Sequence, residues 1–454
     1  MPFLDRDHSI ADEHFSRWLV PPAALAIHLS IGQAYAFSVF NLPLSRLNGG
    51  TESAPGDWKL SSIGWIFSLA IVFLGLSAAV FGAWLERVGP RRAMLTSALC
   101  FAGGFEVAAI GVVIHSFWIV LLGYGVLGGI GLGLGYISPV STLIKWFPDR
   151  PGMATGLAIM GFGGGAMIAS PLSTMLMAHF KPVAPQGVAP TFAVMGALYF
   201  IFMMFGVLTV RVPRPGWKPA GWTPVAGAQR LVTTSNVSAD RAIRTPQFWL
   251  LWLVLCLNVT AGIGVLSVAS PMIQEMFPGR ISVSAAAGFV GLLSLANMGG
   301  RIGWSSFSDV VGRKAVYATF FLLGAALYAF VPTFGRAGNV VLFVAGDVVI
   351  LSMYGGGFAT IPAYLRDLFG VMQVGAIHGR LLTAWSTAGV LGPVLVNYIR
   401  EYEIAHGVAK ADAYTTTMHV MVALLCAGFV CNALVRPVDA RHAATDDAPL
   451  AVST

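Results

Sequence analysis

Twelve apolar segments, each long enough to cross a lipid bilayer, set the strongest limit on how this chain can fold. A hydrocarbon core of about 30 Å needs about 20 apolar residues in a helix. Backbone N–H and C=O groups find no water there, so a crossing segment has to bond them internally. The segments are 18–42, 61–85, 93–114, 117–142, 151–178, 191–211, 247–272, 282–308, 315–335, 338–364, 375–399 and 414–436. We therefore predict an all-α membrane protein with twelve transmembrane helices.

Composition agrees with this prediction. The 454 residues are 56% hydrophobic and 10% charged, whereas soluble domains have about 25% charged residues. The first seventeen residues mix acidic and basic side chains, unlike the basic start of a secretory signal peptide. We expect the first apolar segment to be retained as a helix.

The basic residues are divided unequally between the two ends of the predicted helices. If both termini are cytoplasmic, nineteen of the 27 Lys and Arg residues fall on the cytoplasmic side and seven on the other. Such a bias orients membrane proteins, so we expect cytoplasmic termini. The remaining basic residue, Arg301, lies inside an apolar segment.

The sequence contains an internal repeat with a shift of 223 residues. "GAWLERVGPRRAM" follows the second segment, and "SSFSDVVGRKAV" follows the eighth. The matching pairs are Glu86 and Asp309, Gly89 and Gly312, Pro139 and Pro362, and Gly156 and Gly379. One six-helix unit is used twice, which predicts two pseudo-symmetric halves.

Two parallel halves are typical of secondary transporters, whose substrate site lies at the interface near the bilayer midplane. We predict five parts in the chain. They are a cytoplasmic tail (1–17), an N-terminal six-helix bundle (18–211), a cytoplasmic linker (212–245), a C-terminal six-helix bundle (246–436) and a second cytoplasmic tail (437–454).

The paired loops resemble the loop motif of the major facilitator superfamily. Four further stretches resemble the bacterial oxalate/formate exchanger family and the related monocarboxylate transporters. They are "GQAYAFSVF" (32–40), "KWFPDRPGMATG" (145–156), "NMGGRIGW" (297–304) and "GGGFATIPAY" (355–364). The resemblance implies the major facilitator fold and a small organic anion as substrate.

In each repeated loop an acid ends one helix, and Arg or Lys residues begin the next. Charge pairs between them could lock the cytoplasmic side closed, or the charges could serve only to set the topology. The residues concerned are Glu86, Arg87, Arg91, Arg92, Asp309, Arg313 and Lys314. Two glycine-rich stretches, 123–136 and 161–171, lack the Gly-Lys-Ser/Thr of a phosphate loop, so we expect an ion gradient to supply the energy.

Arg301 is the strongest candidate for substrate binding. A guanidinium at membrane depth costs about 2.5–3.5 kcal/mol, so it needs an anion or a wet cavity. Its repeat partner is Ala78, so the two-fold scheme requires no charge there. The guanidinium fork suits a carboxylate, and the resemblance implies an arginine in helix 8 that contacts one. A structural ion pair is the alternative.

Further candidates surround this arginine. Asn297 lies one turn earlier on the same face and could donate to the substrate or simply pack. Tyr35, Tyr124, Tyr354 and Trp385 lie on helices that line the cavity of this fold, and they could form an aromatic box or serve ordinary packing. The resemblance implies a lysine in helix 11 for a dianion, but none stands between Arg380 and Arg400, so we expect one carboxylate.

Three other ionisable residues inside apolar segments are candidates for proton coupling: His28, Asp347 and Glu106. The ordinary pKa of histidine suits such a role. Each has a plain alternative, which is a core histidine for His28, a structural acid at the periphery for Glu106, and an ion pair with Arg301 in the empty site for Asp347.

The sequence thus predicts a secondary transporter that moves a monocarboxylate of the lactate, pyruvate and formate class together with a proton. The alternatives are an oxalate/formate-type exchanger, a proton-driven exporter of apolar compounds, and a sensor that does not transport. We expect no enzyme activity, cofactor, metal or nucleic-acid partner. We expect a monomer in a bacterial inner membrane.

Overall fold

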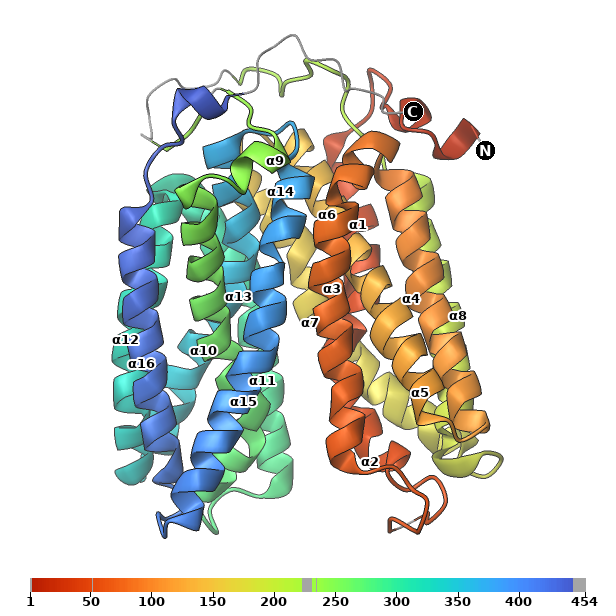
Figure 1. Cartoon of the computed structure of the whole chain (residues 1–454), viewed down its shortest axis with the longest axis vertical. Coiled ribbons are helices and arrows are strands. Elements are labelled where there is room, and N and C mark those ends of the chain that lie inside the picture. The colour runs from red at the N-terminus through yellow and green to blue at the C-terminus, as the bar shows by residue number, and fades with distance from the viewer. Residues whose placement is uncertain (1, 51, 223–230, 234, 444–454) are drawn as a thin grey trace.

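The computed structural model describes residues 2–50, 52–222, 231–233 and 235–443. Within these residues it forms helices and no β-strand, and twelve helical spans are long and apolar enough to cross a membrane (Figure 1). The prediction of an all-α protein with twelve spans is confirmed.

The first six spans form one half of the molecule. They are α1 (Val20–Ile31) continued by η4 (Gly32–Phe40) and α2 (Asn41–Leu44); α3 (Leu60–Val88); α4 (Pro90–Val113); α5 (Phe117–Val120) continued by η5 (Leu121–Gly128) and α6 (Gly129–Trp146); α7 (Pro151–Phe180); and α8 (Val188–Thr209).

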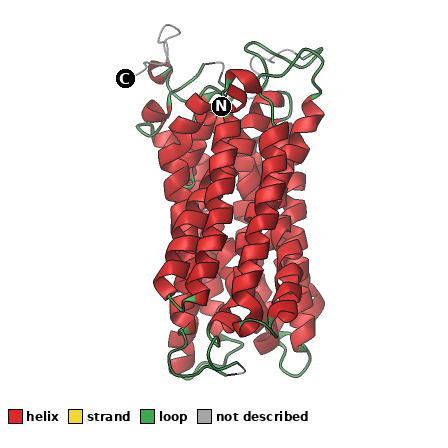
Figure 2. Ribbon diagram, turned by 90° about the vertical axis from the view of Figure 1, so that its right-hand side faces the viewer, coloured by secondary structure: helices red, strands yellow, loops and turns green. Residues whose placement is uncertain are grey.

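The last six spans form the other half, after the short linker helix α9 (Ala239–Ala242). They are α10 (Pro246–Met276); α11 (Val283–Val311); α12 (Arg313–Arg336); α13 (Val340–Phe369); α14 (Val374–Leu381) continued by α15 (Thr383–Ala405); and α16 (Ala413–Leu434). Figure 2 shows that the helices run the full length of the molecule from one end to the other.

Local sequence explains where the helices begin and end. The repeat partners Gly89 and Gly312 follow α3 and α11 with φ of +85° and +92°, a backbone conformation that favours glycine. Each glycine is the single residue between two long helices. Proline opens α4, α7 and α10, where its missing N–H costs nothing.

One end of the molecule carries the described residues nearest both chain ends. The short helices η1 (Pro2–Leu4) and η7 (Ala440–His442) and the described part of the linker all lie at the upper end of Figure 1. We call this end the terminal face and the opposite end the far face. The loops that follow α3 and α11 lie at the terminal face.

The two most extensive helix contacts between the halves are related by the repeat. In the first seam α7 packs on α11, and in the second seam α14 packs on α3. A Cβ added to Gly156 would lie 2.6 Å from the carbonyl oxygen of Arg301, and one added to Gly379 would overlap the carbonyl of Ala78. Because Arg301 and Ala78 are repeat partners, the two seams make the same close backbone contact.

Candidate functional site

Arg301 lies in the first seam, about two thirds of the way along α11, and is fully buried. Its Nε donates to Oδ1 of Asn297 at 2.9 Å, and its Nη1 donates to the carbonyl oxygen of Ile159 in α7 at 2.9 Å. Its Nη2 has no protein partner. None of the ion pairs among the described residues includes Arg301. The guanidinium is therefore hydrogen-bonded but has no counter-ion from the protein.

Aromatic rings from both halves surround the guanidinium. Its Cζ lies 5.8 Å from the ring centroid of Phe162 in α7 and 5.5 Å from that of Phe358 in α13. The ring of Trp385 lies 5.3 Å from Phe162 and 4.6 Å from Phe358. Ring faces attract a cation and exclude water from it. We call Arg301, Asn297, Phe162, Phe358 and Trp385 the central site.

A pair of tyrosines covers the central site toward the far face. The hydroxyls of Tyr35 and Tyr354 lie 3.3 Å apart, and the Tyr35 ring lies 5.0 Å from that of Phe162. Tyr35 belongs to η4 in the first half and Tyr354 to α13 in the second. This hydrogen bond therefore joins the two halves on the far-face side of the central site.

A second polar group covers the central site toward the terminal face. The Tyr136 ring lies 5.4 Å from the His28 ring, 5.8 Å from the His378 ring and 5.3 Å from the Trp385 ring. His28 precedes Tyr35 by seven residues and His378 precedes Trp385 by seven, so each imidazole lies two turns nearer the terminal face. We call His28, Tyr136 and His378 the inner layer.

Five polar atoms in the central site and the inner layer are buried and have no protein partner. They are Arg301 Nη2, Trp385 Nε1, Tyr136 Oη, His28 Nε2 and His378 Nε2. Buried polar atoms in proteins nearly always have a hydrogen-bond partner, so five exceptions at one place indicate a ligand site. The five atoms include the charged Nη2 of Arg301 and the indole N–H of Trp385, and both can donate hydrogen bonds to a carboxylate.

The structure brings together most of the predicted site residues. Arg301, Asn297, Tyr35, Tyr354, Trp385 and His28 all lie in or beside the central site. Tyr124 does not, so the prediction that it joins the aromatic box is wrong. Its hydroxyl donates to Oε1 of Gln33 at 2.9 Å, and its ring packs 4.4 Å from that of Phe37, inside the first half.

The other two proton candidates lie away from Arg301. Glu106 is exposed on α4, where it lies against Gly196 of α8. Asp347 in α13 is fully buried, and neither carboxylate oxygen has a partner. The expected ion pair between Asp347 and Arg301 is not formed, so that alternative is wrong for this structure.

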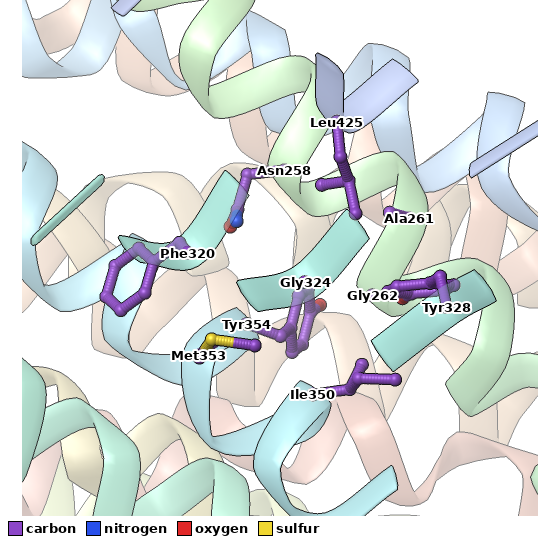
Figure 3. A pocket seen from close by; sticks show the side chains of 10 residues that line it. All are labelled: Asn258, Ala261, Gly262, Phe320, Gly324, Tyr328, Ile350, Met353, Tyr354 and Leu425. Carbon is purple, nitrogen blue, oxygen red and sulfur yellow. The ribbon is translucent and has the colours of Figure 1, made fainter. Parts of the chain in front are cut away.

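A small cavity inside the second half adjoins the site through Tyr354 (Figure 3). It lies between α10, α12, α13 and α16 and has about 10 Å³ of free space, which is room for one water molecule. The side chains of Asn258 and Tyr328 reach it with polar atoms that have no protein partner. Tyr354 lines this cavity with its ring, while its hydroxyl bonds Tyr35.

The acids of the repeated loops close the terminal side of both seams. Asp309 accepts from the N–H groups of Gly152 at 2.9 Å and Met153 at 2.8 Å, at the start of α7. Glu86 accepts from the N–H of Gly375 at 3.0 Å, at the start of α14. Gly152 and Gly375 are repeat partners, so each acid caps a helix of the opposite half, where the helix dipole favours negative charge.

The basic residues of the second loop follow the prediction in part. Arg313 donates to Asp309 at 2.6 Å and to Asp367 at 3.1 Å, and all three side chains are largely buried. Lys314 instead donates to the carbonyl oxygens of Ala433 and Val435 at 2.7 and 2.8 Å. Only the arginine of this loop pairs with its acid.

In the first loop the predicted charge pairs are wrong. Glu86 pairs with Lys145 at 2.7 Å, and Arg87 is exposed. Arg91 is buried and donates to the carbonyl oxygens of Phe3 and His8, both at 2.9 Å, whereas Arg92 pairs with Asp5. Both arginines therefore bind the N-terminal tail, whereas Lys314, the repeat counterpart of Arg91, binds carbonyl oxygens at the end of α16.

Sequence reasoning missed Tyr136, His378, Phe162 and Phe358. One signal was available for His378, since it is an imidazole within an apolar segment, as His28 is, and it directly precedes the repeat glycine Gly379. Tyr136 lies in the stretch that matches Phe358 and its neighbours under the repeat, but nothing in its surroundings distinguishes it from a packing residue.

Comparisons with known proteins agree with this architecture. A family model described as the Major Facilitator Superfamily matches residues 14–393. The oxalate:formate antiporter of Oxalobacter formigenes is 27% identical over 384 residues, covering 83% of each chain. Monocarboxylate transporter 11 of Homo sapiens is 24% identical over 393 residues, covering 85% of this chain and 77% of its own. The crystal structure of the Escherichia coli fucose:proton symporter FucP superposes with a TM-score of 0.65 at 14% identity, covering 93% of this chain and 100% of its own.

Proposed function

This chain belongs to the major facilitator superfamily, and from that premise we propose that it is a proton-coupled transporter of a small monocarboxylate. The substrate class is that of lactate, pyruvate and formate. The protein is an integral multi-pass membrane protein with the fold of transporters, which are not enzymes. Alternating access around the central site would carry the substrate and a proton across.

One observation carries this proposal. Arg301 is a fully buried guanidinium without a carboxylate partner from the protein, and both its Nη2 and the Nε1 of Trp385, packed around the same two phenylalanine rings, are unbonded. A carboxylate that accepts from both would supply the missing counter-ion and use donors that otherwise stay unbonded. Because the central site contains one cation, it favours a ligand with one carboxylate.

The names of two relatives support the substrate class. One is called an oxalate:formate antiporter and the other a monocarboxylate transporter. The antiporter relative makes exchange of two anions the second candidate function. Exchange and proton symport use the same arginine but differ in whether uptake needs an anion on the opposite side.

Of the three proton candidates, His28 fits the proposal best. It is fully buried in the inner layer, whereas Glu106 lies on the exposed side of α4 and Asp347 is buried in α13 within the second half. His28 also lies next to the central site, so we assign to it the proton exchange that accompanies substrate binding and release.

We extend the proposal to orientation. Both termini would be cytoplasmic, in a bacterial inner membrane, so the terminal face would be the cytoplasmic side. The structure would then be closed toward the cytoplasm. The chain would act as a monomer, divided into the tails 1–17 and 437–454, the bundles 18–211 and 246–436, and the linker 212–245.

The test is uptake of labelled lactate into liposomes that contain the purified protein, with and without an inward proton gradient. We expect accumulation driven by the gradient, and a loss of about 100-fold or more for Arg301→Lys, which keeps the charge but not the fork. Arg336→Lys is the matched control, since Arg336 is half exposed at the end of α12.

Each rival function gives a different outcome. Uptake that needs an anion inside the liposome and ignores the gradient would replace symport with exchange. Undiminished transport by Arg301→Ala would favour an exporter of apolar compounds. Binding of lactate to the purified protein without any uptake would favour a sensor.

A further inference from the structure

We propose, resting on the function above, that the inner layer of His28, Tyr136 and His378 is a second subsite that binds a hydroxyl group next to the carboxylate of the substrate. The preferred ligand is then a short 2-hydroxy acid. Unsubstituted acids of the same length, and formate, are poorer substrates because they leave this layer without a partner.

The inner layer is a built site rather than a group of core residues. All three side chains are at most 1% exposed, and each has a polar atom without a protein partner. The residues come from three helices of both halves: His28 from α1, Tyr136 from α6 and His378 from α14. Leaving a buried donor or acceptor unbonded is unfavourable, so a ligand that bonds to them gains affinity.

The His28 ring determines what kind of group it binds. Its Nδ1 lies 3.1 Å from the carbonyl oxygen of Ala24. A carbonyl oxygen can only accept, so Nδ1 has to carry the hydrogen, and in the neutral ring Nε2 is then an acceptor. The unpartnered Nε2 therefore needs a donor from the ligand, which a hydroxyl provides and an oxo group does not.

The neighbouring atoms complete the match to a hydroxyl. Tyr136 Oη can donate to the hydroxyl oxygen while that hydroxyl donates to His28 Nε2. The Tyr136 ring also lies 5.3 Å from that of Trp385, whose N–H belongs to the carboxylate side of the site. The two subsites are thus adjacent, as the carboxylate and the 2-hydroxyl of one short acid are.

The inner layer also predicts an order of preference among 2-hydroxy, 2-oxo and unsubstituted acids. A 2-hydroxy acid bonds to both Tyr136 Oη and His28 Nε2, two of the three unpartnered atoms of the layer. A 2-oxo acid accepts from Tyr136 but leaves His28 Nε2 unbonded, and an unsubstituted acid leaves both. Sites that hydrogen-bond a substrate hydroxyl discriminate strongly against analogues without it, because their buried polar groups lose their partner.

The experiment measures competing uptake of lactate, pyruvate and propionate, three acids of equal carbon number, into liposomes that contain the full chain. We expect lactate to exceed pyruvate, and lactate to exceed propionate by tenfold or more in kcat/KM. Tyr136→Phe removes one hydroxyl and keeps the ring, so the lactate-to-propionate ratio should fall about tenfold. Tyr199→Phe is the matched control, because Tyr199 also has a buried, unpartnered hydroxyl but lies in α8.

The outcomes separate this inference from the proposed function. If no short acid is transported, the proposed function fails. If propionate and lactate are transported equally well by the wild type, or if Tyr136→Phe lowers both to the same extent, the hydroxyl subsite is overturned while the monocarboxylate function stands. His28→Phe supplies a second measurement, with the same fall in the lactate-to-propionate ratio expected and retention of the wild-type ratio contradicting it.

Discussion

The two seams between the halves match in their backbone contacts but differ in the side chains that they bury. In both, a repeat glycine packs against the backbone of its partner helix, and a loop acid caps the helix that begins there. In the first seam the residue whose carbonyl faces the repeat glycine is Arg301. In the second seam the matching residue is Ala78, which is also fully buried. The backbone contacts between the halves are therefore symmetric, but the proposed substrate site is not.

This difference teaches which features a repeat can supply. A duplicated helix pair gives two equivalent close contacts between helices. No side chain has to be added for this, because a close backbone contact needs only a glycine. A single carboxylate, however, needs one guanidinium, and a second one in the matching seam would be an uncompensated buried charge. The symmetry thus lies in the backbone contacts between the halves, and the departure from it lies at the proposed substrate site.

The largest effect should follow from removing this asymmetry with Ala78→Arg. A guanidinium buried in the second seam would have no anion, which costs about 3–5 kcal/mol by analogy with broken buried ion pairs. We expect little folded protein and no uptake. Ala78→Met is the control, since it adds similar length without charge and should cost only the overpacking of about 1–3 kcal/mol. Equal thermal stability of the two variants would mean that the second seam accommodates a charge as well as the first.

A second large effect should follow from breaking the feature that the seams share. Gly156→Ala and Gly379→Ala each place a methyl group against a backbone carbonyl of the opposite half. The backbone cannot move aside without separating the halves, so we expect uptake to fall tenfold or more in both variants. Gly303→Ala in α11 is the control, because a Cβ there meets no atom within 4 Å.

Two uptake results would contradict the view that both glycines serve the closure of the halves. If only Gly156→Ala impairs uptake, the defect comes from Arg301 and not from the closure of the halves. If Gly303→Ala impairs uptake as much as either, the loss reflects a general intolerance of α11 and of its neighbours to added volume.

A moderate effect should distinguish the two loop acids. Asp309 accepts from two backbone N–H groups and pairs with the buried Arg313, whereas Glu86 accepts from one N–H and pairs with Lys145. A helix cap contributes about 0.5–2 kcal/mol. We expect Asp309→Asn to accelerate hydrogen exchange at the start of α7 about tenfold, and Glu86→Gln to accelerate it at the start of α14 by less.

The control for these caps is Asp412→Asn, whose partner Arg336 lies 4.0 Å away at an exposed position. Its exchange pattern should match that of the wild type. Equal acceleration at α7 and α14 in the two cap variants would show that the buried Arg313 pair adds nothing to the first seam.

The fold was predictable from sequence because apolar length alone forces twelve helices. Arg301 was predictable for the same reason, since a charge within an apolar segment has few explanations. The position of Tyr124 was not predictable. It lies in η5, a π-helical stretch (Leu121–Gly128), whose longer hydrogen-bond register turns side chains away from the face expected of a regular helix. Twelve residues later, Tyr136 is the tyrosine of this span that reaches the site.

The partners of the loop arginines were not predictable either, for a different physical reason. The repeat matches Arg91 and Arg92 to Lys314 and its neighbour Ala315, but the repeated motifs do not include the N-terminal tail. The tail supplies the carbonyl oxygens of Phe3 and His8 to Arg91. Only the docked tail shows that the two loops bind different groups.

The smallest effect should appear at the far face, where the halves also differ. Residues 45–59 join the first two spans, but only residues 277–282 join their repeat counterparts. Asp57 organises the longer loop, since its carboxylate accepts from the N–H groups of Asn48 at 2.8 Å, Gly49 at 3.1 Å and Ala54 at 2.8 Å. Partial burial, the largest single influence, raises the pKa of Asp57, but these three bonds together outweigh it and hold the pKa below its usual value.

A depressed carboxyl pKa stabilises the loop above the ordinary aspartate pKa of about 3.9, and this stabilisation is lost as the pH falls through the lower folded value. Asp57→Asn should therefore accelerate hydrogen exchange at the amides of Gly49 and Ala54 about two- to fivefold at pH 7, because exposed bonds of this kind contribute only about 0.5 kcal/mol. At about pH 3 the difference from the wild type should shrink, since the wild-type carboxyl becomes protonated too. A difference that stayed constant from pH 7 to pH 3 would assign the effect to the shape of the side chain, and the longer loop would then owe its order to packing rather than to charge.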